Sequence, residues 1–403
     1  MTFVLHCTEL AIYFPTLKFK GPFADTEDVS HDKTIGDGPV IFACLLGMAS
    51  QILIGRRLRI PRMFNYTSGV ALFAIYLLSN SDFFPSVYDI FPSHAVSVVH
   101  SLLFLWFVTL LLIEVLLLLR DRIPPFRSDR REMLRRTTAA LCVAPAVVFG
   151  FGIITRKEFC IKEIDVKLPH LPPDLNGRRL LLISDIHLGT FYGAKDLARV
   201  VDESNNLRHD IAFVTGDLIT TKWDPLDSCL AELKRLRSPN GVWGCMGNHE
   251  LYAKVQNYTE TKAREMGMIF LRHQATKLPF GNSRINLVGV DYQRRHSPYL
   301  VGVDQLIAPG DFNLLLSHNP DVFPVAAKQG FDLTLSGHTH GGQINVEILG
   351  ENLNAADFAT PYTKGLYTEK NSAVYVTAGL GTIGIPVRLG APAEITLIRL
   401  CNS

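Results

Sequence analysis

Charged residues are scarce in this 403-residue chain: Asp, Glu, Lys and Arg make up 19% of it, below the roughly 25% of an average soluble domain. The charges also nearly cancel, with 40 basic against 38 acidic residues, so the chain lacks the basic excess of a nucleic-acid binder. Its seven cysteines form no CxxC pair and have no regular spacing, which excludes a zinc ribbon and a disulfide scaffold. With 47% apolar residues, the chain is not largely disordered either.

The apolar excess is concentrated in the first 155 residues. The segment 98–119 is apolar on every face apart from His100 and Glu114, and a helix needs about 20 residues to cross a bilayer. Shorter apolar segments at 39–55 and 64–79, and an uncharged one at 137–155, are further candidates. We therefore predict an N-terminal tail at 1–38, about three transmembrane helices within 39–119, a basic cytoplasmic loop at 120–136, and a fourth transmembrane helix or signal anchor at 137–155.

The loop charges predict an orientation. Arginines fill the loops at 56–62 and 120–136, whereas 80–95 contains no Lys or Arg, and cytoplasmic loops are the ones enriched in basic residues. The pair Arg130-Arg131, ahead of an uncharged segment, resembles a twin-arginine export signal. The alternative is that these arginines are only the basic cytoplasmic flank of a membrane span. Both interpretations predict the same topology. We expect a multi-pass cell-membrane protein with its C-terminal domain on the extracytoplasmic face, and interhelical polar contacts for His100 and Glu114.

The remaining 248 residues, 156–403, show a different pattern. Short, uniformly apolar runs predict strands of a sheet that is buried on both faces, at 179–184, 211–215, 285–290, 312–317, 331–336, 373–378 and 394–400. Helical spacing of apolar residues occurs between them, at 194–207 and 226–237. This alternation predicts an α/β layered domain.

Polar side chains with metal-binding chemistry follow four of these extended segments and the short run GVWGCM at 241–246, at the strand ends where ligands bind in such sheets. They are Asp185, His187, Asp217, Asn248, His318, His338 and His340. Imidazole and carboxylate ligands suit divalent ions such as Zn, Fe and Mn, and the absence of cysteine disfavours a structural zinc. Seven ligands are too many for one ion, whereas two ions that share a bridging carboxylate account for them.

The motifs carry a family resemblance. SDIHLG at 184–189, Gly-Asp at 216–217, Gly-Asn-His-Glu at 247–250, the lone His318 and SGHTHGGQ at 336–343 together resemble the calcineurin-like metallophosphoesterase superfamily. The last motif resembles that of its membrane-anchored bacterial branch. The resemblance covers about 160–400 and implies a four-layer α-β-β-α sandwich over 156–403, preceded by the N-terminal helical transmembrane region.

The same resemblance implies roles for individual residues. One divalent ion (Mn, Fe or Zn) would be held by Asp185, His187, Asp217 and His340, and the other by Asp217, Asn248, His318 and His338. A hydroxide that bridges the two ions would attack phosphorus, and His249 would protonate the leaving oxygen. Glu250 stands where many relatives have Asp, and no Asp can be assigned to orient His249, since Asp224 is merely nearby in sequence.

We therefore expect a membrane-anchored hydrolase of phosphodiester or pyrophosphate bonds, acting on a phosphorylated small molecule or a lipid-linked substrate, with no nucleic-acid partner. The alternatives are a UDP-diacylglucosamine-type pyrophosphohydrolase of lipid A synthesis, a broad phosphomonoesterase, and a membrane sensor whose domain only binds. Arg388 and the loop 379–382 could contact phosphate, but turn and packing roles are favoured. His209, His273 and His296 lack a motif context and are expected to be ordinary side chains.

Overall fold

The computed structural model describes residues 38–57, 59–79, 85–91, 93–121, 147–294, 297–348 and 351–403. Several parts of the chain named above lie outside the described residues: the expected tail before residue 38, the Arg130-Arg131 pair, His296 and most of the segment 120–146. The chain divides into two compact units, Glu9–Phe151 and Gly152–Ser403, and each is described by itself.

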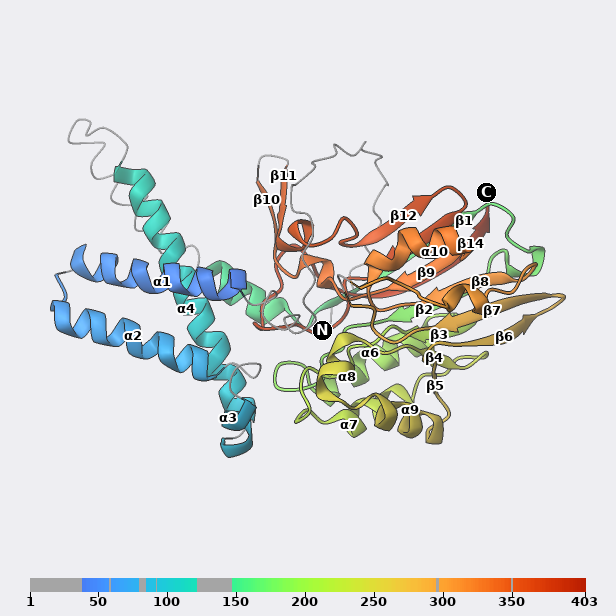
Figure 1. Cartoon of the computed structure of the whole chain (residues 1–403), viewed down its shortest axis with the longest axis horizontal. Helices are drawn as coiled ribbons and strands as arrows, with labels where there is room; N and C mark the ends of the chain where they lie inside the picture. The colour runs from blue at the N-terminus through green and yellow to red at the C-terminus, as the bar shows by residue number, and fades with distance from the viewer. Residues whose placement is uncertain are drawn as a thin grey trace. The chain divides into compact units, whose positions relative to one another are not determined.

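The first unit is helical (Figure 1). Its helices are α1 (Gly38–Arg57), α2 (Arg62–Leu78), α3 (Pro85–Ile90) and α4 (Ser93–Asp121). Helices thus occupy all three segments expected between residues 39 and 119. Within the described residues, one stretch, His94–Leu119 in α4, is long and apolar enough to cross a membrane. A further helical segment covers 147–155.

The helices α1, α2 and α4 pack around the buried side chains of Cys44, Tyr76 and Phe107. Gly47 of α1 lies directly against α4, because a Cβ atom there would fall 2.3 Å from the backbone oxygen of Phe107. Small residues of this kind let helix backbones approach each other closely.

His100 and Glu114, the two ionisable residues within the apolar segment 98–119, make contacts with other helices, as the sequence predicted. The Glu114 carboxylate lies 3.2 Å from Arg57 Nη2 of α1. The His100 ring stacks on Tyr76 of α2 at 4.6 Å between ring centroids, and its Nδ1 lies 3.1 Å from Ser79 Oγ. Glu114 therefore links α4 to α1, and His100 links α4 to α2.

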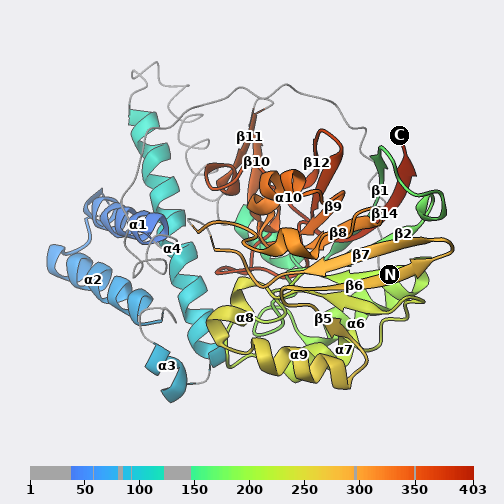
Figure 2. The ribbon, with the colours of Figure 1, turned by 45° about the vertical axis from the view of Figure 1, so that its right-hand side comes forward.

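The second unit contains two six-stranded sheets (Figures 1 and 2). The strand order in the first is β1-β14-β2-β3-β4-β5, and β2 to β5 are parallel. In the second it is β12-β13-β9-β8-β7-β6, with β13, β9, β8 and β7 parallel.

The strands of the first sheet are β1 (Phe159–Leu168), β2 (Arg179–Ile183), β3 (Ile211–Val214), β4 (Val242–Gly244), β5 (Ile269–Phe270) and β14 (Ala393–Asn402). Those of the second are β6 (Gln274–Phe280), β7 (Ser283–Gly289), β8 (Phe312–Leu316), β9 (Leu333–Ser336), β12 (Gly365–Glu369) and β13 (Ser372–Val376), and a separate hairpin pairs β10 (Asn345–Ile348) with β11 (Glu351–Asn354).

Both faces of each sheet are buried, which explains the uniformly apolar strands. In β2, Leu180 and Leu182 join a core cluster that also contains Leu314 and Leu316 of the other sheet. Leu181, between them in sequence, joins a second cluster with residues of the covering helices. Successive side chains of a strand point to opposite faces, so one face of β2 meets the second sheet and the other meets helices.

The helices complete the outer layers. The helices α6 (Ala194–Asn206), α7 (Leu226–Leu233) and α9 (Gln256–Glu265) belong to the first sheet's side, and α10 (Phe323–Gln329) packs against the second sheet. The short helix α8 (Asn248–Ala253) and the 3-10 turns η1 (Pro173–Leu175), η2 (Val303–Leu306), η3 (Pro320–Val322), η4 (His340–Gly342) and η5 (Ala355–Phe358) lie in the connections. The domain is therefore the mixed α/β sandwich that the sequence predicted, with layers in the order α-β-β-α.

Candidate metal centre

The seven expected ligands lie at one edge of the sandwich. Asp185 and His187 follow β2, Asp217 follows β3, and Asn248 begins α8 after β4. The other three come from the second sheet, His318 after β8 and His338 and His340 after β9. These five strands belong to the parallel portions of their sheets, so their carboxyl ends meet where the two sheets face each other.

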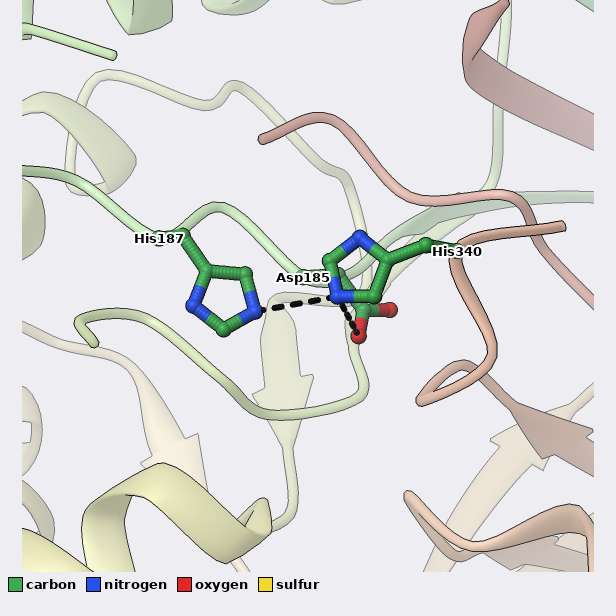
Figure 3. A group of neighbouring side chains, drawn as sticks. All are labelled: Asp185, His187 and His340. Carbon is green, nitrogen blue, oxygen red and sulfur yellow. Dashed lines mark hydrogen bonds and ion pairs between the residues drawn. The ribbon is translucent and has the colours of Figure 1, made fainter. Parts of the chain in front are cut away.

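One group of side chains consists of Asp185, His187 and His340, whose ligand atoms all lie within 4.8 Å of one another. Figure 3 shows both imidazoles turned toward the same point, with the Asp185 carboxylate beside His340. The two Nε2 atoms are 3.2 Å apart, and His340 Nε2 is 3.5 Å from Asp185 Oδ1. Such convergence of nitrogen and carboxylate oxygen is what a divalent cation requires.

A second group, Asp217, His318 and His338, meets the same 4.8 Å criterion. A third group of this kind joins Asp217 to His187 and His249. Asp217 Oδ2 lies 3.0 Å from His318 Nε2 and 3.5 Å from His187 Nε2. Its other oxygen, Oδ1, accepts a hydrogen bond from the backbone N–H of His249 at 2.9 Å. The carboxylate is therefore held by one oxygen while the other faces both groups.

The electrostatics of these side chains fit a bound cation. Burial lowers the pKa of His187 to about 3, and the charge of His249 adds to the effect; burial also places the pKa of His340 well below its ordinary value. Both rings are thus neutral at pH 7, as metal ligands must be. Burial alone would lower the pKa of His318, but the carboxylates of Asp217 and Asp185 raise it to about 10.

Two further observations test whether a metal fits. His318 Nδ1 lies 2.6 Å from the Thr215 carbonyl; a carbonyl only accepts, so Nδ1 carries the proton and, in the neutral ring, the Nε2 lone pair is left for a ligand bond. Asn248 Oδ1 is buried without a hydrogen-bond partner among the described residues, which is costly unless another group satisfies it. The residues present therefore fit divalent ions.

The backbone at the centre is strained. Five of the seven ligands have positive φ angles: Asp185 at 51°, His187 at 45°, Asp217 at 53°, His338 at 75° and His340 at 53°. Residues other than glycine rarely adopt this region, and each such residue costs of order 1–3 kcal/mol. Contacts from other parts of the domain must hold these turns in place. Three groups of residues make such contacts: Glu250, the loop after β13 and the loop after Asp217.

The first is Glu250, which is completely buried. Its Oε2 accepts hydrogen bonds from the N–H groups of Asp217 and Gly247, at 2.9 and 2.8 Å, and its Oε1 accepts one from Leu218 at 2.8 Å. Burial raises the pKa of Glu250, and the Asp217 charge adds to the rise. Glu250 thus fixes the turn that carries Asp217, a role that its position in the sequence motif did not disclose.

The second is the loop after β13, in which Gly381 donates a hydrogen bond to the Asp185 carbonyl at 2.7 Å. A Cβ at Gly379 would lie 2.5 Å from Asp185 Cβ, and one at Gly381 would lie 2.9 Å from His187 Cβ. Arg388 is 3% exposed and donates hydrogen bonds to the carbonyls of this loop and of Ala391. The structure thus shows a packing role for this loop and for Arg388, the role that the sequence favoured over contact with phosphate.

The third is the loop after Asp217. The carbonyl oxygen of Thr220 lies 2.7 Å from His249 Nδ1, and the hydroxyl oxygen of the same residue, Thr220 Oγ1, lies 3.0 Å from His187 Nδ1. Asp224 in turn accepts hydrogen bonds through Oδ2 from the N–H groups of Thr220 and Thr221, at 3.0 and 2.7 Å. Asp224 therefore acts on His249 through the backbone, which sequence proximity alone could not indicate.

His209 and His273 take no part in the cluster. His209 Nδ1 lies 3.0 Å from the Leu207 carbonyl, and His273 Nε2 lies 3.4 Å from Gln293 Nε2. Neither belongs to a group of potential metal ligands among the described residues.

Replacing Glu250 with Gln should destabilise the domain by about 1–3 kcal/mol, because an amide NH₂ would face at least one backbone N–H that now has an acceptor. The measurement is urea unfolding of the full chain in detergent with EDTA present, so that metal loss does not contribute. Glu265→Gln, at an exposed position in a surface ion pair, is the matched control and should change the free energy of unfolding by less than about 0.5 kcal/mol. Equal effects of the two substitutions would contradict the anchoring role of Glu250.

Comparisons with known proteins agree with this geometry. The sequence model of the calcineurin-like phosphoesterase family matches residues 178–342. A transmembrane protein with metallophosphoesterase domain from Danio rerio is 34% identical over 66% of this chain and 63% of its own length. Its namesake from Bos taurus is 32% identical over 68% and 64%, and an uncharacterised metallophosphoesterase from Campylobacter jejuni is 29% identical over 60% and 63%.

The chain thus spans less than two thirds of the length of each of these relatives. The matched region, 178–342, contains all seven side chains that converge at the edge of the sandwich. The chain therefore carries a domain of the calcineurin-like metallophosphoesterase superfamily.

Proposed function

We propose that this chain is a membrane-anchored, dinuclear metal-dependent hydrolase of phosphodiester or pyrophosphate bonds. The observation that carries the proposal is Asp217 Oδ2, which lies within 3.5 Å of Nε2 atoms from two ligand groups. Asp185, His187, Asp217 and His340 would hold one ion, and Asp217, Asn248, His318 and His338 the other. Two such ions would neutralise charge on the phosphoryl oxygens and lower the pKa of the attacking water.

In this proposal, His249 acts as the general acid. Because the Thr220 carbonyl can only accept, His249 Nδ1 carries a proton that it donates there, and Nε2 is the atom that faces the centre. Nε2 lies 4.0 Å from Asp217 Oδ2 and has no hydrogen-bond partner among the described residues. A protonated Nε2 would donate its proton to the leaving oxygen as the P–O bond breaks.

We also propose that the chain belongs to the membrane-anchored bacterial branch of the family, whose members carry GHTHGGQ. The last residue of this motif, Gln343, donates hydrogen bonds to the carbonyls of Ile383 and Ile385 and accepts one from the N–H of Ile383. The motif thus joins the ligand turn after β9 to the loop after β13. Its relatives include both animal and bacterial proteins.

We propose further that α1, α2 and α4 each cross the membrane, that the segment 137–155 crosses it a fourth time, and that the phosphoesterase domain therefore lies on the extracytoplasmic face. The contacts within the helical unit support three alternating crossings. The carboxyl-terminal ends of α1 and α4 meet at the Arg57–Glu114 ion pair, and Gly47 meets Phe107 earlier along both helices, so the two run parallel. The contact of His100 with Ser79 joins the start of α4 to the end of α2, so these two run antiparallel.

The hydrolase proposal predicts distinct outcomes for two substitutions. Asp217→Asn should lose bound metal and activity together, because the carboxylate faces both ligand groups. His249→Ala should retain the metal and lose about 10²- to 10⁴-fold in kcat, the usual contribution of a general acid. The assay uses the full chain in detergent with Mn²⁺ and compares a bis-aryl phosphate, an aryl monophosphate and UDP-diacylglucosamine, with bound metal measured by mass spectrometry. No metal-dependent turnover of any substrate would refute the hydrolase and favour a binding-only domain.

The contact of Asp224 with the Thr220 loop predicts a split between two variants. Asp224→Ala should lower kcat by about 10- to 100-fold, since misplacing a catalytic group by about 1 Å can cost 10²-fold, and should leave the bound metal in place. Asp224→Asn keeps an oxygen acceptor and should restore most of the rate. An Asn variant as slow as the Ala variant would show that the charge of Asp224, and not its hydrogen bonds, matters.

The proposed topology is tested by reporters fused to the C-terminus of the full chain. Alkaline phosphatase, which needs an oxidising compartment, should be active there, and green fluorescent protein exported in an unfolded state should be dark. The reverse pattern would place the domain in the cytoplasm and direct the search for its substrate to the cytoplasmic leaflet.

A further inference from the structure

A cavity opens beside the metal centre on the side of His338. It has a volume of about 200 Å³ and is lined by Tyr292, Asn319, Pro320, Asp321, His338, Thr339, Ala356, Ala359 and Thr360. Its walls come from the loops after β7, β8 and β9 and from η5. Because His338 is both an expected metal ligand and a wall of the cavity, a phosphoryl group at the metals would extend one of its substituents into it.

The size of the cavity limits that substituent. Sites for drug-sized ligands measure roughly 300–1,000 Å³. At about 30 Å³ for a water-sized group, this cavity holds about seven non-hydrogen atoms. A small alcohol fits within it.

The charge of the lining selects among small alcohols. Asp321 is the one carboxylate among the nine lining residues, and none of them is Lys or Arg. Asp321 Oδ1 accepts a hydrogen bond from Thr360 Oγ1 at 2.5 Å. Its Oδ2 forms no hydrogen bond or ion pair with the residues that the structure describes. The carboxylate thus lacks a cationic partner in a site that handles phosphate anions.

The other polar side chains of the lining are already engaged. Asn319 donates to the Gln293 carbonyl at 2.7 Å and accepts from the N–H of Asp321 at 2.9 Å. Thr339 Oγ1 donates to the Thr363 carbonyl. Tyr292 adds an aromatic ring, 5.3 Å from the His338 ring between centroids. An unpaired carboxylate together with an aromatic ring is the combination that recognises an ammonium group.

We propose that this cavity binds the ammonium group of a phosphodiester in which one alcohol is a small amino alcohol. The inference rests on the proposed phosphodiesterase function. An ammonium group this close to divalent ions needs a negative charge on its other side, and Asp321 supplies it. The leaving oxygen takes its proton from His249, whose ring lies beside His187 at 4.7 Å, whereas His338 lies beside His318 and Tyr292. The amino alcohol is therefore the substituent that stays on phosphorus.

The reaction balances without a further reactant. Water adds to phosphorus, the P–O bond to the other alcohol breaks, and that oxygen leaves with the proton from His249, which the attacking water replaces. The products are the free alcohol and the amino-alcohol phosphate.

The test compares two esters of the same shape on the full chain in detergent with Mn²⁺. One is 4-nitrophenyl phosphorylcholine, and the other is 4-nitrophenyl 3,3-dimethylbutyl phosphate, in which carbon replaces the charged nitrogen. The wild type should prefer the choline ester by about tenfold or more in kcat/KM, within the range of a desolvated cation–π and carboxylate site. In Asp321→Asn the ratio should fall to about one. Asp357→Asn removes an exposed acid of η5 that does not line the cavity, and should keep the wild-type ratio.

The outcomes separate this inference from the proposed function. Turnover of both esters at equal kcat/KM by the wild type would refute the ammonium site and leave the phosphodiesterase intact. A preference that survives in Asp321→Asn, or is lost equally in Asp357→Asn, would also refute it, since the selectivity would then come from elsewhere or from overall charge. If neither ester turns over, calorimetric titration with phosphorylcholine and 3,3-dimethylbutyl phosphate decides, and equal affinities would overturn the inference.

Discussion

Two carboxylates buried side by side between the sheets impose the main constraint on this domain. Asp185 is 0% and Asp217 is 1% exposed, and both approach His318 Nε2, at 3.8 and 3.0 Å. Removing two like charges from water is costly unless positive charge lies next to them. The raised pKa of His318 is one response to that field, and divalent ions held by the surrounding imidazoles would be a stronger one.

The turns after the strands are built to keep these groups in place. Five of the expected ligands adopt positive φ angles, a region that residues other than glycine rarely adopt. Buried contacts from other parts of the chain hold the backbone in these strained conformations. Glu250 holds the turn of Asp217, the loop after β13 packs on Asp185 and His187, and Thr220 holds His187 and His249. A centre positioned in this way is preorganised, because its ligands need little rearrangement to bind an ion.

The surroundings of the centre differ on its two sides. Near His249, a backbone carbonyl fixes the imidazole that we propose as the general acid. Near His338 lies a small cavity whose lining contains one carboxylate. The two proposals thus assign proton transfer and substrate choice to different loops, as expected for a sandwich that presents several strand ends at one edge.

The sequence by itself determined most of the sheets' apolar inner strands, although not the three-residue β4, and the identity of the residues at their ends. Runs such as 179–184 are apolar on both faces because both faces are buried, and that pattern is local. The edge strand β1 (Phe159–Leu168), with its partly exposed side chains, and the two-residue β5 gave no such signal. The roles of Glu250 and Asp224, and the cavity beside Asp321, were decided only by the tertiary structure. Each depends on contacts between segments that lie far apart in sequence or on backbone hydrogen bonds, which neither composition nor spacing encodes.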